Sequence, residues 1–371
     1  MVGVFVLARW LGATHRDLSR WVVAGGNFAA RSGAPRSLYI FPHVSGYDGQ
    51  FYWRLAASPT HLGIGQFLGV RFDAGFRANR IFYPAVSWLV AGGSVNNVTW
   101  SLVVVNCMAI VGLVALALWI LRASTASPLY ALSVILVPGL IGALSRDLTE
   151  AVTSLAVVAG VLFMRRERWL LAALAWSGAL LTRETTAVLL AVYGVFALLE
   201  IVRRQRRVRL ADLSWVAPYI VFGVWQFVVR AATGHFPLLS SSGSGDVGVP
   251  FVGLVSSVPH WFSPTSSHQI IKGVLYSVQF MAVLVVFVAA WRNRRSVARS
   301  EFTVLALAVL LVICETAHGW RSPFDDRYAT VPMALAWFQL LTSTKRSRLT
   351  RTSLAVTPVV VLTALWRMVV V

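Results

Sequence analysis

The chain has 371 residues, of which 57% are hydrophobic and only 13% are charged. Soluble proteins carry about 25% charged residues, so the composition excludes an ordinary soluble domain and predicts a polytopic membrane protein. The net charge of +19 does not indicate a nucleic-acid-binding protein, because the basic residues fall in short clusters between apolar runs. Cys107 and Cys314 lie in apolar runs and show neither disulfide nor zinc-site spacing.

The N-terminal part of the chain is predicted to form one long extracytoplasmic loop. Residues 1–11 are apolar except for Arg9 and are shorter than a full span of about 20 residues, which predicts either a shortened first helix or a wrongly chosen start codon. A cleaved signal peptide is disfavoured, because the segment lacks a basic n-region. Residues 13–97 follow as the first extracytoplasmic loop. Within it, residues 81–97 are short, contain Pro84 and include a glycine pair, so we expect an interfacial or re-entrant segment there.

Apolar runs able to cross the bilayer as helices follow this loop. With the N-terminal segment they give about eleven transmembrane helices, in a single all-α integral membrane domain over residues 1–371. A second long extracytoplasmic loop is predicted for residues 232–270, which contain a serine–glycine linker. The predicted spans are 99–121, 128–144, 149–164, 169–182, 185–202, 213–229, 273–291, 302–317, 329–342 and 353–371.

Basic clusters occur in every second loop between these spans, at residues 165–168, 203–209, 292–299 and 345–348. Cytoplasmic loops of membrane proteins carry such an excess of Lys and Arg, so we assign these loops to the cytoplasm. Six acidic residues fall in the alternate loops or at their helix ends and are therefore expected on the extracytoplasmic side: Asp147, Glu150, Glu184, Asp246, Asp325 and Asp326. Asp48 and Asp73 join them only if residues 81–97 do not cross the membrane.

Four polar patches are predicted to meet on the extracytoplasmic side, and Arg80 adds a further cation. A carboxylate close to lipid is costly unless it is used or paired, which makes Asp48, among aromatics and glycines, the first candidate. Each patch also has a purely structural explanation: a turn aspartate at Asp48, loop ion pairs at the Arg–Asp and Arg–Glu steps, and a helix N-cap at the last acids. The patches are residues 43–54, 145–150, 181–185 and 324–328.

These residue types suit group transfer from an anionic, lipid-linked donor. A carboxylate next to an acceptor hydroxyl can act as a general base, and interfacial arginines can bind a phosphate leaving group bidentately. The aromatic residues around Asp48, such as Tyr47 and Tyr52, can stack on sugar rings or form an aromatic belt at the headgroup level. The sequence therefore leaves both roles open for the aromatics.

One segment resembles the first-loop motif of GT-C-type integral membrane glycosyltransferases: Tyr-Asp-Gly-Gln-Phe-Tyr at 47–52, followed by Arg-Leu-Ala at 54–56. It is most similar to the bacterial branch that also resembles the GPI-pathway mannosyltransferases. Further short blocks resemble those bacterial proteins in the same order along the chain, so that the resemblance covers residues 40–345. These blocks are residues 80–84, 146–150, 181–185 and 326–328.

The resemblance implies a GT-C-like bundle in the bacterial plasma (inner) membrane. Such an enzyme transfers mannose or another hexose or pentose from a polyprenyl-phosphate donor to a lipid or glycan acceptor on the extracytoplasmic side. The resemblance implies Asp48 as the catalytic base, although many members have two adjacent acids where Asp48 stands alone. It names no certain cofactor and leaves a divalent cation open.

The remaining candidate site residues are assigned to substrate binding, and none to a metal. Arg183 and Arg327 are expected to contact the donor phosphate. The candidate substrate-binding residues are Tyr47, Gln50, Tyr52, Arg80, Arg146, Asp147, Glu150, Arg183, Glu184, Asp326, Arg327 and Tyr328.

Two other functions stay open. A flippase or transporter for a lipid-linked anionic substrate would bind phosphate through arginines without breaking a bond. It would need polar residues within the helices, and the chain offers mainly Asn106, Gln226 and Gln279 there, which favours an enzyme. A polymerase or ligase of undecaprenyl-linked glycans is a neighbouring chemistry. The expected partners are the lipid-linked donor, the acceptor and membrane lipids, and not nucleic acid.

Overall fold

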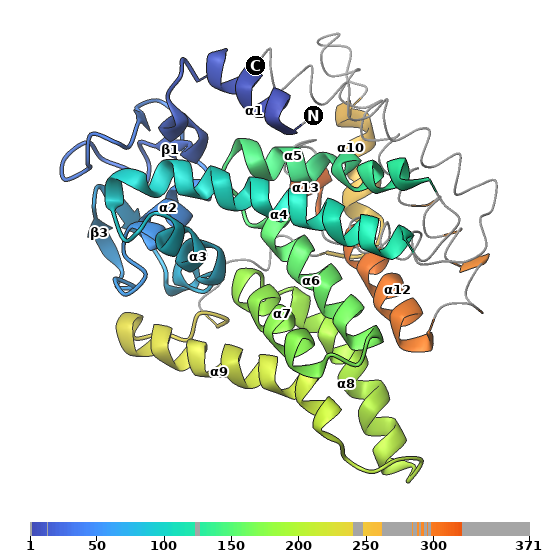
Figure 1. Ribbon diagram of the computed structural model, residues 1–371. Helices are drawn as coiled ribbons and strands as arrows, with labels where there is room; N and C mark the ends of the chain where they lie inside the picture. The colour runs from blue at the N-terminus through green and yellow to red at the C-terminus, as the bar shows by residue number, and fades with distance from the viewer. Residues whose placement is uncertain are drawn as a thin grey trace.

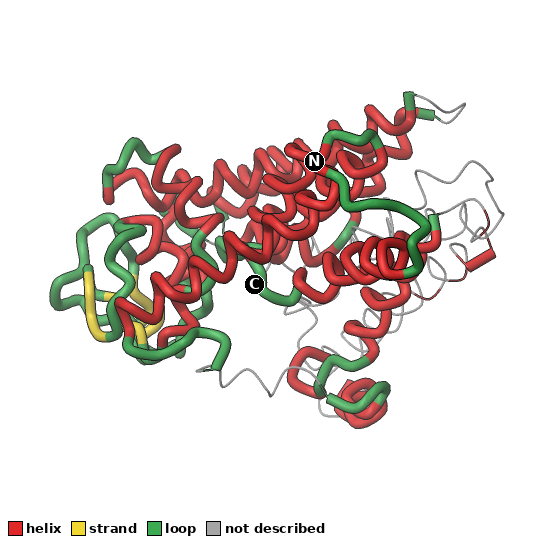
Figure 2. The backbone as a smooth tube through the Cα atoms, turned by 90° about the horizontal axis from the view of Figure 1, so that it is seen from below, coloured by secondary structure: helices red, strands yellow, loops and turns green. Residues whose placement is uncertain are grey.

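The computed structural model describes residues 2–12, 14–122, 127–239, 248–261 and 298–320, with the single residues 284, 288, 291, 292 and 295 (Figure 1). Within these residues the chain is mostly helical, as predicted. The strands of the described part are two or three residues long and lie at one end of the molecule (Figure 2). All of them belong to residues 14–97, which we call the N-terminal segment.

The N-terminal segment follows a first helix and is built from short elements around helix α2. Strands β1 and β2 pair in parallel, and strands β3 and β4 form an antiparallel hairpin. The elements are α1 (Val2–Leu11), the 3-10 helix η1 (Leu18–Val22), β1 (Ala24–Gly25), β2 (Ile40–Phe41), α2 (Gly49–Ala57), β3 (Gly65–Phe67), β4 (Val70–Phe72), η2 (Gly75–Ala78), α3 (Phe82–Val90) and η3 (Val95–Asn97).

Close backbone packing places the loop that precedes Asp48. A β-carbon at Gly25 would lie 2.1 Å from the backbone nitrogen of Gly46, so only glycine fits at the end of β1. The backbone N–H of Gly25 donates to the side-chain oxygen of Gln50 at 3.2 Å, and Gln50 itself is buried. These contacts join β1 to the first turn of α2, whose N-terminal end carries Asp48.

A buried arginine joins α2 to the β3–β4 hairpin. The guanidinium of Arg54 donates to the carbonyl oxygens of Gly63, Gly65 and Val70 at 2.6, 2.5 and 3.1 Å, and it lies 3.7 Å from the ring centroid of Phe72. Burial lowers the pKa of Arg54 to about 10. Arg54 lies in the block that resembles the glycosyltransferase motif, and in this fold its contacts are structural.

The helices that follow form the larger part of the described structure. Their bounds agree with the predicted apolar runs to within one to four residues for most of them. They are α4 (Val98–Leu121), the 3-10 helix η4 (Pro128–Leu136), α5 (Pro138–Ser145), α6 (Glu150–Arg165), α7 (Trp169–Thr182), α8 (Thr186–Val202), η5 (Leu210–Asp212), α9 (Leu213–Thr233), α10 (Val252–Trp261), α12 (Arg299–Ile313) and α13 (Ala317–Trp320).

The expectation of about eleven spans is not supported. In the described part, two helical segments are long and apolar enough to cross a membrane, Val95–Leu121 and Leu210–Thr233. Helices α6, α7 and α8 have 16, 14 and 17 residues, which correspond to about 21–26 Å against a hydrocarbon core of about 30 Å. The predicted spans at 329–342 and 353–371, and most of 273–291, lie outside the described residues.

The predicted span at 128–144 is divided in two. Pro138 lacks a backbone N–H and restricts the preceding residue to extended conformations, and Val137 has φ −76° and ψ 111°. The chain therefore leaves η4 at Val137 and starts again as α5 at Pro138. Helix α3 has nine residues, about 14 Å, and is also too short to cross a membrane. An interfacial or re-entrant position for residues 81–97 stays a prediction.

The N-terminal segment and the basic turns lie at different ends of the helices. In Figure 1 the N-terminal segment lies at the left, next to the beginning of α4, and the turn after α6 and the loop after α8 lie toward the right. Helix α9 runs from the basic loop back toward the N-terminal segment. The basic turns after α6 and α8 therefore lie away from the segment that carries Asp48.

Asn106, buried in α4, connects α3, α4 and the α5–α6 turn. Its side-chain amide donates to the hydroxyl oxygen of Tyr83 at 2.9 Å and to the backbone oxygen of Leu148 at 3.1 Å. We expect Asn106→Leu to lower the free energy of unfolding by about 1–3 kcal/mol, because both partners lose a buried hydrogen bond.

Thermal unfolding in detergent measures this effect, with Met108→Leu on the exposed face of α4 as the control. The control is expected within about 0.5 kcal/mol of the parent protein. Equal unfolding temperatures for the two variants would contradict the role of Asn106.

Candidate functional site

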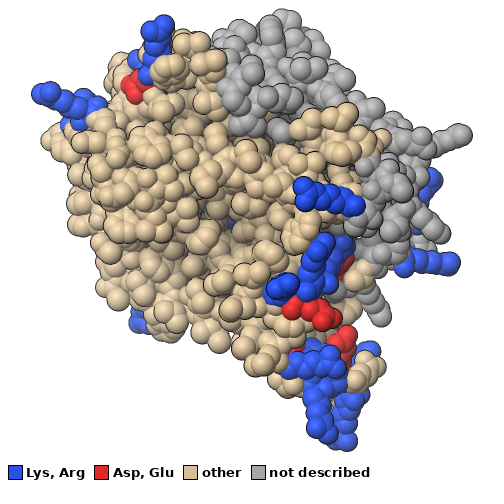
Figure 3. Space-filling model, in the orientation of Figure 1, with Lys and Arg blue, Asp and Glu red and all other residues tan. Residues whose placement is uncertain are grey.

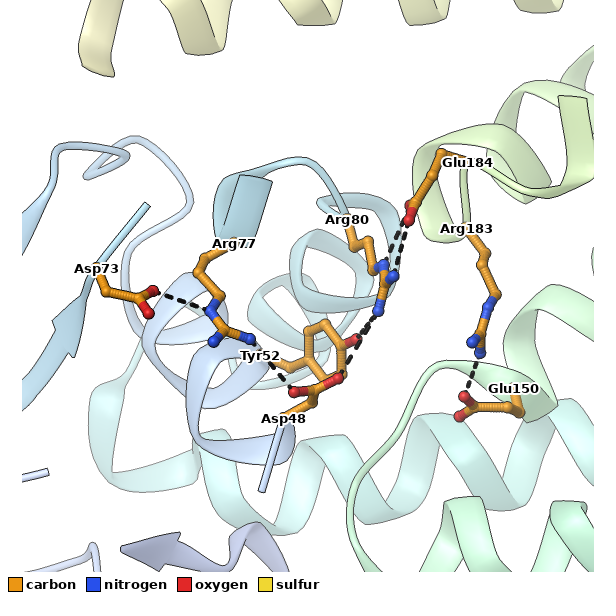
Figure 4. Close-up of polar contacts among 8 residues, drawn as sticks. All are labelled: Asp48, Tyr52, Asp73, Arg77, Arg80, Glu150, Arg183 and Glu184. Carbon is orange, nitrogen blue, oxygen red and sulfur yellow. Dashed lines mark hydrogen bonds and ion pairs between the residues drawn. The ribbon is translucent and has the colours of Figure 1, made fainter. Parts of the chain in front are cut away.

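Asp48 lies at the N-terminal end of α2, but its side chain does not cap the helix. One carboxylate oxygen is 3.5 Å from Nη1 of Arg77, and the other is 3.7 Å from Nη1 of Arg80 (Figure 4). The side chain of Asp48 keeps 20% of its surface exposed. The carboxylate is thus held by long ion-pair contacts between two guanidinium groups and remains accessible to solvent.

Arg77 is placed by the 3-10 helix η2 and by aromatic rings. Its Nε donates to Asp73 at 3.1 Å, one helical turn earlier, and its guanidinium lies 4.0 Å from the ring centroid of Phe51 and 4.4 Å from that of Phe76. A guanidinium over an aromatic face is stabilised by the ring quadrupole. These contacts orient Arg77 toward Asp48.

Arg80 forms a bidentate ion pair with Glu184 and a hydrogen bond with Tyr52. Its Nε and Nη2 donate to the two carboxylate oxygens of Glu184 at 3.1 and 2.7 Å, and its Nη1 donates to the hydroxyl oxygen of Tyr52 at 3.1 Å. Burial alone would raise the pKa of Glu184, but the charge and hydrogen bonds of Arg80 outweigh it and lower the pKa to about 2. Burial raises the pKa of Tyr52, so its hydroxyl stays protonated.

Helix α9 fixes the short stretch between the two arginines. The indole N–H of Trp225 donates to the backbone oxygens of Ala78 and Asn79 at 3.2 and 3.1 Å. The side-chain amide of Gln226 donates to the side-chain oxygen of Asn79 at 2.5 Å. A helix long enough to span a membrane therefore holds the segment that carries Arg77 and Arg80.

The two arginines and Asp48 line a small hollow that is open to solvent. It is a shallow depression with about 210 Å³ of space between the side chains, part of which is open solvent. Its lining residues are Asp48, Phe51, Tyr52, Phe76, Arg77 and Arg80.

Arg183 and Glu184 are neighbours in the turn between α7 and α8, and their side chains point to different partners (Figure 4). Glu184 pairs with Arg80, whereas Arg183 pairs with Glu150 at the start of α6. Both side chains of the second pair are only 2% exposed. Arg183 does not line the hollow, so in this structure its position differs from the phosphate-contacting position expected from the sequence.

The block at 146–150 lies next to the first loop. The guanidinium of Arg146 is 4.6 Å from the ring centroid of Tyr47. Asp147 is fully buried in a left-handed conformation, with φ 51°, and its carboxylate has no hydrogen-bond partner among the described residues. Burial raises the pKa of Asp147 well above its usual range, although the charge of Arg9 opposes this. Neither Arg146 nor Asp147 lines the hollow.

The structure brings together part of the predicted site. Asp48, Tyr52 and Arg80 line the hollow, with Glu184 behind Arg80. The other predicted residues of the described part, Tyr47, Gln50, Arg146, Asp147, Glu150 and Arg183, lie outside its lining, and Asp326, Arg327 and Tyr328 lie outside the described residues. Among the described residues no group of three or more His, Cys, Asp or Glu side chains could hold a metal ion.

Arg77 was not predicted from the sequence. A signal was present, because Asp73, Arg77 and Arg80 are spaced by four and three residues, which puts them on one side of a helical turn. The segment has no apolar periodicity, and its arginine could equally have been a solvated surface residue. One of the ring contacts that orient Arg77, the contact with Phe51, comes from the separate helix α2.

The pKa of Glu184 gives a pH-dependent prediction. The pKa is about 2 in the folded protein and 4.5 in an unpaired glutamate, so the ion pair stabilises the fold fully above pH 4.5 and loses this contribution as the pH falls toward 2. At pH 7 we expect Glu184→Gln to lower the free energy of unfolding by about 3 kcal/mol. The difference in the free energy of unfolding between Glu184→Gln and the parent protein should narrow below pH 4.5.

Thermal unfolding in detergent at a series of pH values measures this. Glu200→Gln is the matched control, since Glu200 also pairs with an arginine but is 51% exposed. An exposed pair contributes at most about 1 kcal/mol. A pH-independent difference for Glu184→Gln, or an equal loss in both variants, would argue against the assigned ion pair.

A scan against protein-family models found no match to this chain, and searches of curated proteins and of solved structures found none either. The resemblance to GT-C-type glycosyltransferases therefore stays a prediction from the motifs alone.

Proposed function

We propose that this protein is a membrane glycosyltransferase that uses a polyprenyl-phosphate sugar donor, with Asp48 as the general base. One observation carries the proposal: an accessible carboxylate that does not cap its helix lies between two arginines in a small open hollow. A purely structural turn aspartate would be expected to bond to the helix N-terminus. The sugar, the acceptor and the stereochemistry are left open, with inversion as the expectation.

The arginines are proposed to bind the donor phosphate. In the free protein Arg77 and Arg80 contact Asp48 only at 3.5 and 3.7 Å. A phosphate in the hollow would offer both guanidinium groups shorter, charge-assisted hydrogen bonds. The phosphate would then replace Asp48 as their partner, which leaves the carboxylate available to accept a proton. This assigns to Arg77 and Arg80 the role that the sequence assigned to Arg183 and Arg327.

The proposed transfer is a single displacement. The carboxylate of Asp48 accepts the proton of the acceptor hydroxyl as its oxygen forms a bond to the anomeric carbon. The bond between that carbon and the phosphate oxygen breaks, and polyprenyl phosphate leaves with the bonding electrons, stabilised by Arg77 and Arg80. The phenol of Tyr52 lines the same hollow and can contact the sugar.

The described part of the helices supports an enzyme over a flippase or transporter. A transport path would need polar side chains free to line it within the helices. Asn106 bonds to Tyr83 and Leu148, and Gln226 bonds to Asn79. These two side chains hold the fold together, and Gln279 lies outside the described residues.

Asp48→Asn tests the general base. We expect transfer from a polyprenyl-phosphate sugar to fall at least about 100-fold, since general base catalysis contributes about 10²–10⁴-fold. The assay incubates the purified full chain in detergent with a panel of lipid-linked sugars and scores the release of polyprenyl phosphate. Asp73→Asn is the matched control, because Asp73 contacts the same Arg77 but does not line the hollow. Near-normal transfer by Asp48→Asn would exclude Asp48 as the base.

Arg77→Gln tests the phosphate contact. Loss of one charge-assisted contact to the donor phosphate is expected to lower kcat/KM for the donor about tenfold or more, and the apparent affinity for added polyprenyl phosphate should fall with it. Arg71→Gln, an exposed arginine on the neighbouring strand β4, is expected to leave both values unchanged. An unchanged affinity for polyprenyl phosphate in Arg77→Gln would remove Arg77 from the site.

A further inference from the structure

The loop between α8 and α9 carries a concentrated positive charge. Residues 200–212 contain five arginines and two carboxylates, a net charge of +3. Figure 3 shows blue side chains gathered at the lower right, over this loop and near the α6–α7 turn. The arginines of the loop divide into one that holds the loop together and four that project into solvent.

Arg206 is the arginine that holds the loop together. Its Nη1 and Nη2 donate to the two carboxylate oxygens of Asp212 at 3.0 and 2.7 Å, and its Nε donates to Glu200 at 2.8 Å. Asp212 also accepts from the backbone N–H of Arg209 at 2.9 Å. One arginine thus uses both acidic side chains of the loop and links the end of α8 to the start of α9.

The other arginines keep their charge exposed. Arg203, Arg204, Arg207 and Arg209 are all exposed. Within the loop, both carboxylates already bind Arg206, so the exposed guanidinium groups have no acidic partner there. A fixed loop with uncompensated guanidinium groups is prepared to bind an anionic surface, because little conformational entropy is left to lose on binding.

Aliphatic side chains stand beside these arginines. Val208 and Leu210 are 73% and 81% exposed, and Val202 and Leu213 are exposed as well. Neither a free phosphate nor a nucleic acid would bury the exposed valine and leucine side chains on binding. The boundary between lipid headgroups and acyl chains accommodates both, since guanidinium groups contact the phosphates and aliphatic side chains enter the apolar region.

The position of the loop also favours a lipid surface. It leads directly into Leu210–Thr233, one of the two segments long and apolar enough to span a membrane. The α6–α7 turn provides a second contact of the interfacial type, because the guanidinium of Arg166 lies 4.1 Å from the ring centroid of Trp119, close to the end of α4. Tryptophan is enriched at the headgroup level of membranes.

We propose that the α8–α9 loop is a binding surface for anionic phospholipids, in which Arg203, Arg204 and Arg207 contact headgroup phosphates. Val208 and Leu210 enter the adjoining acyl region, and Arg206 keeps the loop in shape. This surface is separate from the hollow around Asp48 and does not depend on the function proposed for that hollow.

The test compares two variants of equal charge in the full chain. The first replaces Arg203, Arg204 and Arg207 with glutamine and keeps Arg206, which holds the loop together, and Arg209, whose backbone N–H donates to Asp212. The matched control replaces Arg16, Arg36 and Arg71, which are exposed in the N-terminal segment, with glutamine. Energy transfer from the protein tryptophans to dansyl-labelled phosphatidylglycerol in neutral detergent micelles gives the Kd, and dansyl-labelled phosphatidylcholine gives the reference.

The loop variant is expected to raise the Kd for phosphatidylglycerol about tenfold or more, since three basic residues that attract an anionic surface are removed. The control variant should keep the parent Kd, and added salt should weaken binding more in the parent than in the loop variant. An equal loss in both variants, an unchanged Kd, or equal binding of phosphatidylcholine would overturn the proposal.

Competition separates a lipid from other anions. Millimolar inorganic phosphate that displaces the lipid probe would assign the loop to a free anion, and displacement by a polyglutamate peptide would assign it to an acidic protein segment. Either result would overturn the lipid assignment. Retention of the probe in the presence of both competitors, together with its loss from the loop variant, supports the proposal. Thermal unfolding of both variants reports whether the fold is kept.

Discussion

The ion pair between Arg80 and Glu184 is the interaction on which the site depends. It joins residues 104 positions apart in the chain, one in the N-terminal segment and one in the α7–α8 turn. Both side chains are mostly buried, and the contact is bidentate. Removal of either partner would leave a charge in a poorly solvated place, which costs far more than the net gain from forming the pair. The N-terminal segment is therefore held against the helices by a contact that tolerates the loss of neither partner alone.

The same pair determines how the carboxylate of Asp48 is held and how accessible it is. Because Glu184 satisfies two of the N–H groups of Arg80, and Asp73 engages Arg77, the carboxylate of Asp48 contacts the two guanidinium groups only at their outer atoms. If one arginine bound Asp48 bidentately, both carboxylate oxygens would be occupied and the pair would have a structural role. Here the nearby acids anchor the arginines, and the side chain of Asp48 keeps 20% of its surface exposed. For that reason Asp48 lies close to two positive charges and is still accessible to solvent.

Local sequence patterns predicted the helices well and the number of spans poorly. The run at 169–182 reproduces α7, and the start of α9 follows its predicted run. These boundaries depend on hydropathy and on turn residues, which are local properties. Whether a helix of 14 to 17 residues crosses a membrane depends on its neighbours and on the bilayer. Apolarity alone therefore overestimates the number of spans. The break at Pro138 was readable in principle, because proline restricts the residue before it.

For the site, the sequence identified charged residues but not their partners. Asp48, Arg80 and Glu184 were correctly placed in one neighbourhood, since their blocks fall on the same side of the predicted membrane. Arg183, which was expected to contact the donor phosphate, pairs with Glu150 in this structure and does not line the hollow. Adjacent residues at a helix-to-helix turn point in different directions, so the partner of each depends on the tertiary packing.

That turn has a consequence for the order of residues in the chain. Arg183 and Glu184 face a carboxylate and a guanidinium respectively, and a single peptide bond links them. Exchanging the two residues would leave the length, the net charge, the hydropathy and every predicted helix unchanged. It would nevertheless set a carboxylate against Glu150 and a guanidinium against Arg80, turning two attractions into two repulsions. The order of Arg183 and Glu184 in the α7–α8 turn is thus matched to the charges of Glu150 and Arg80. Composition and periodicity do not depend on this order.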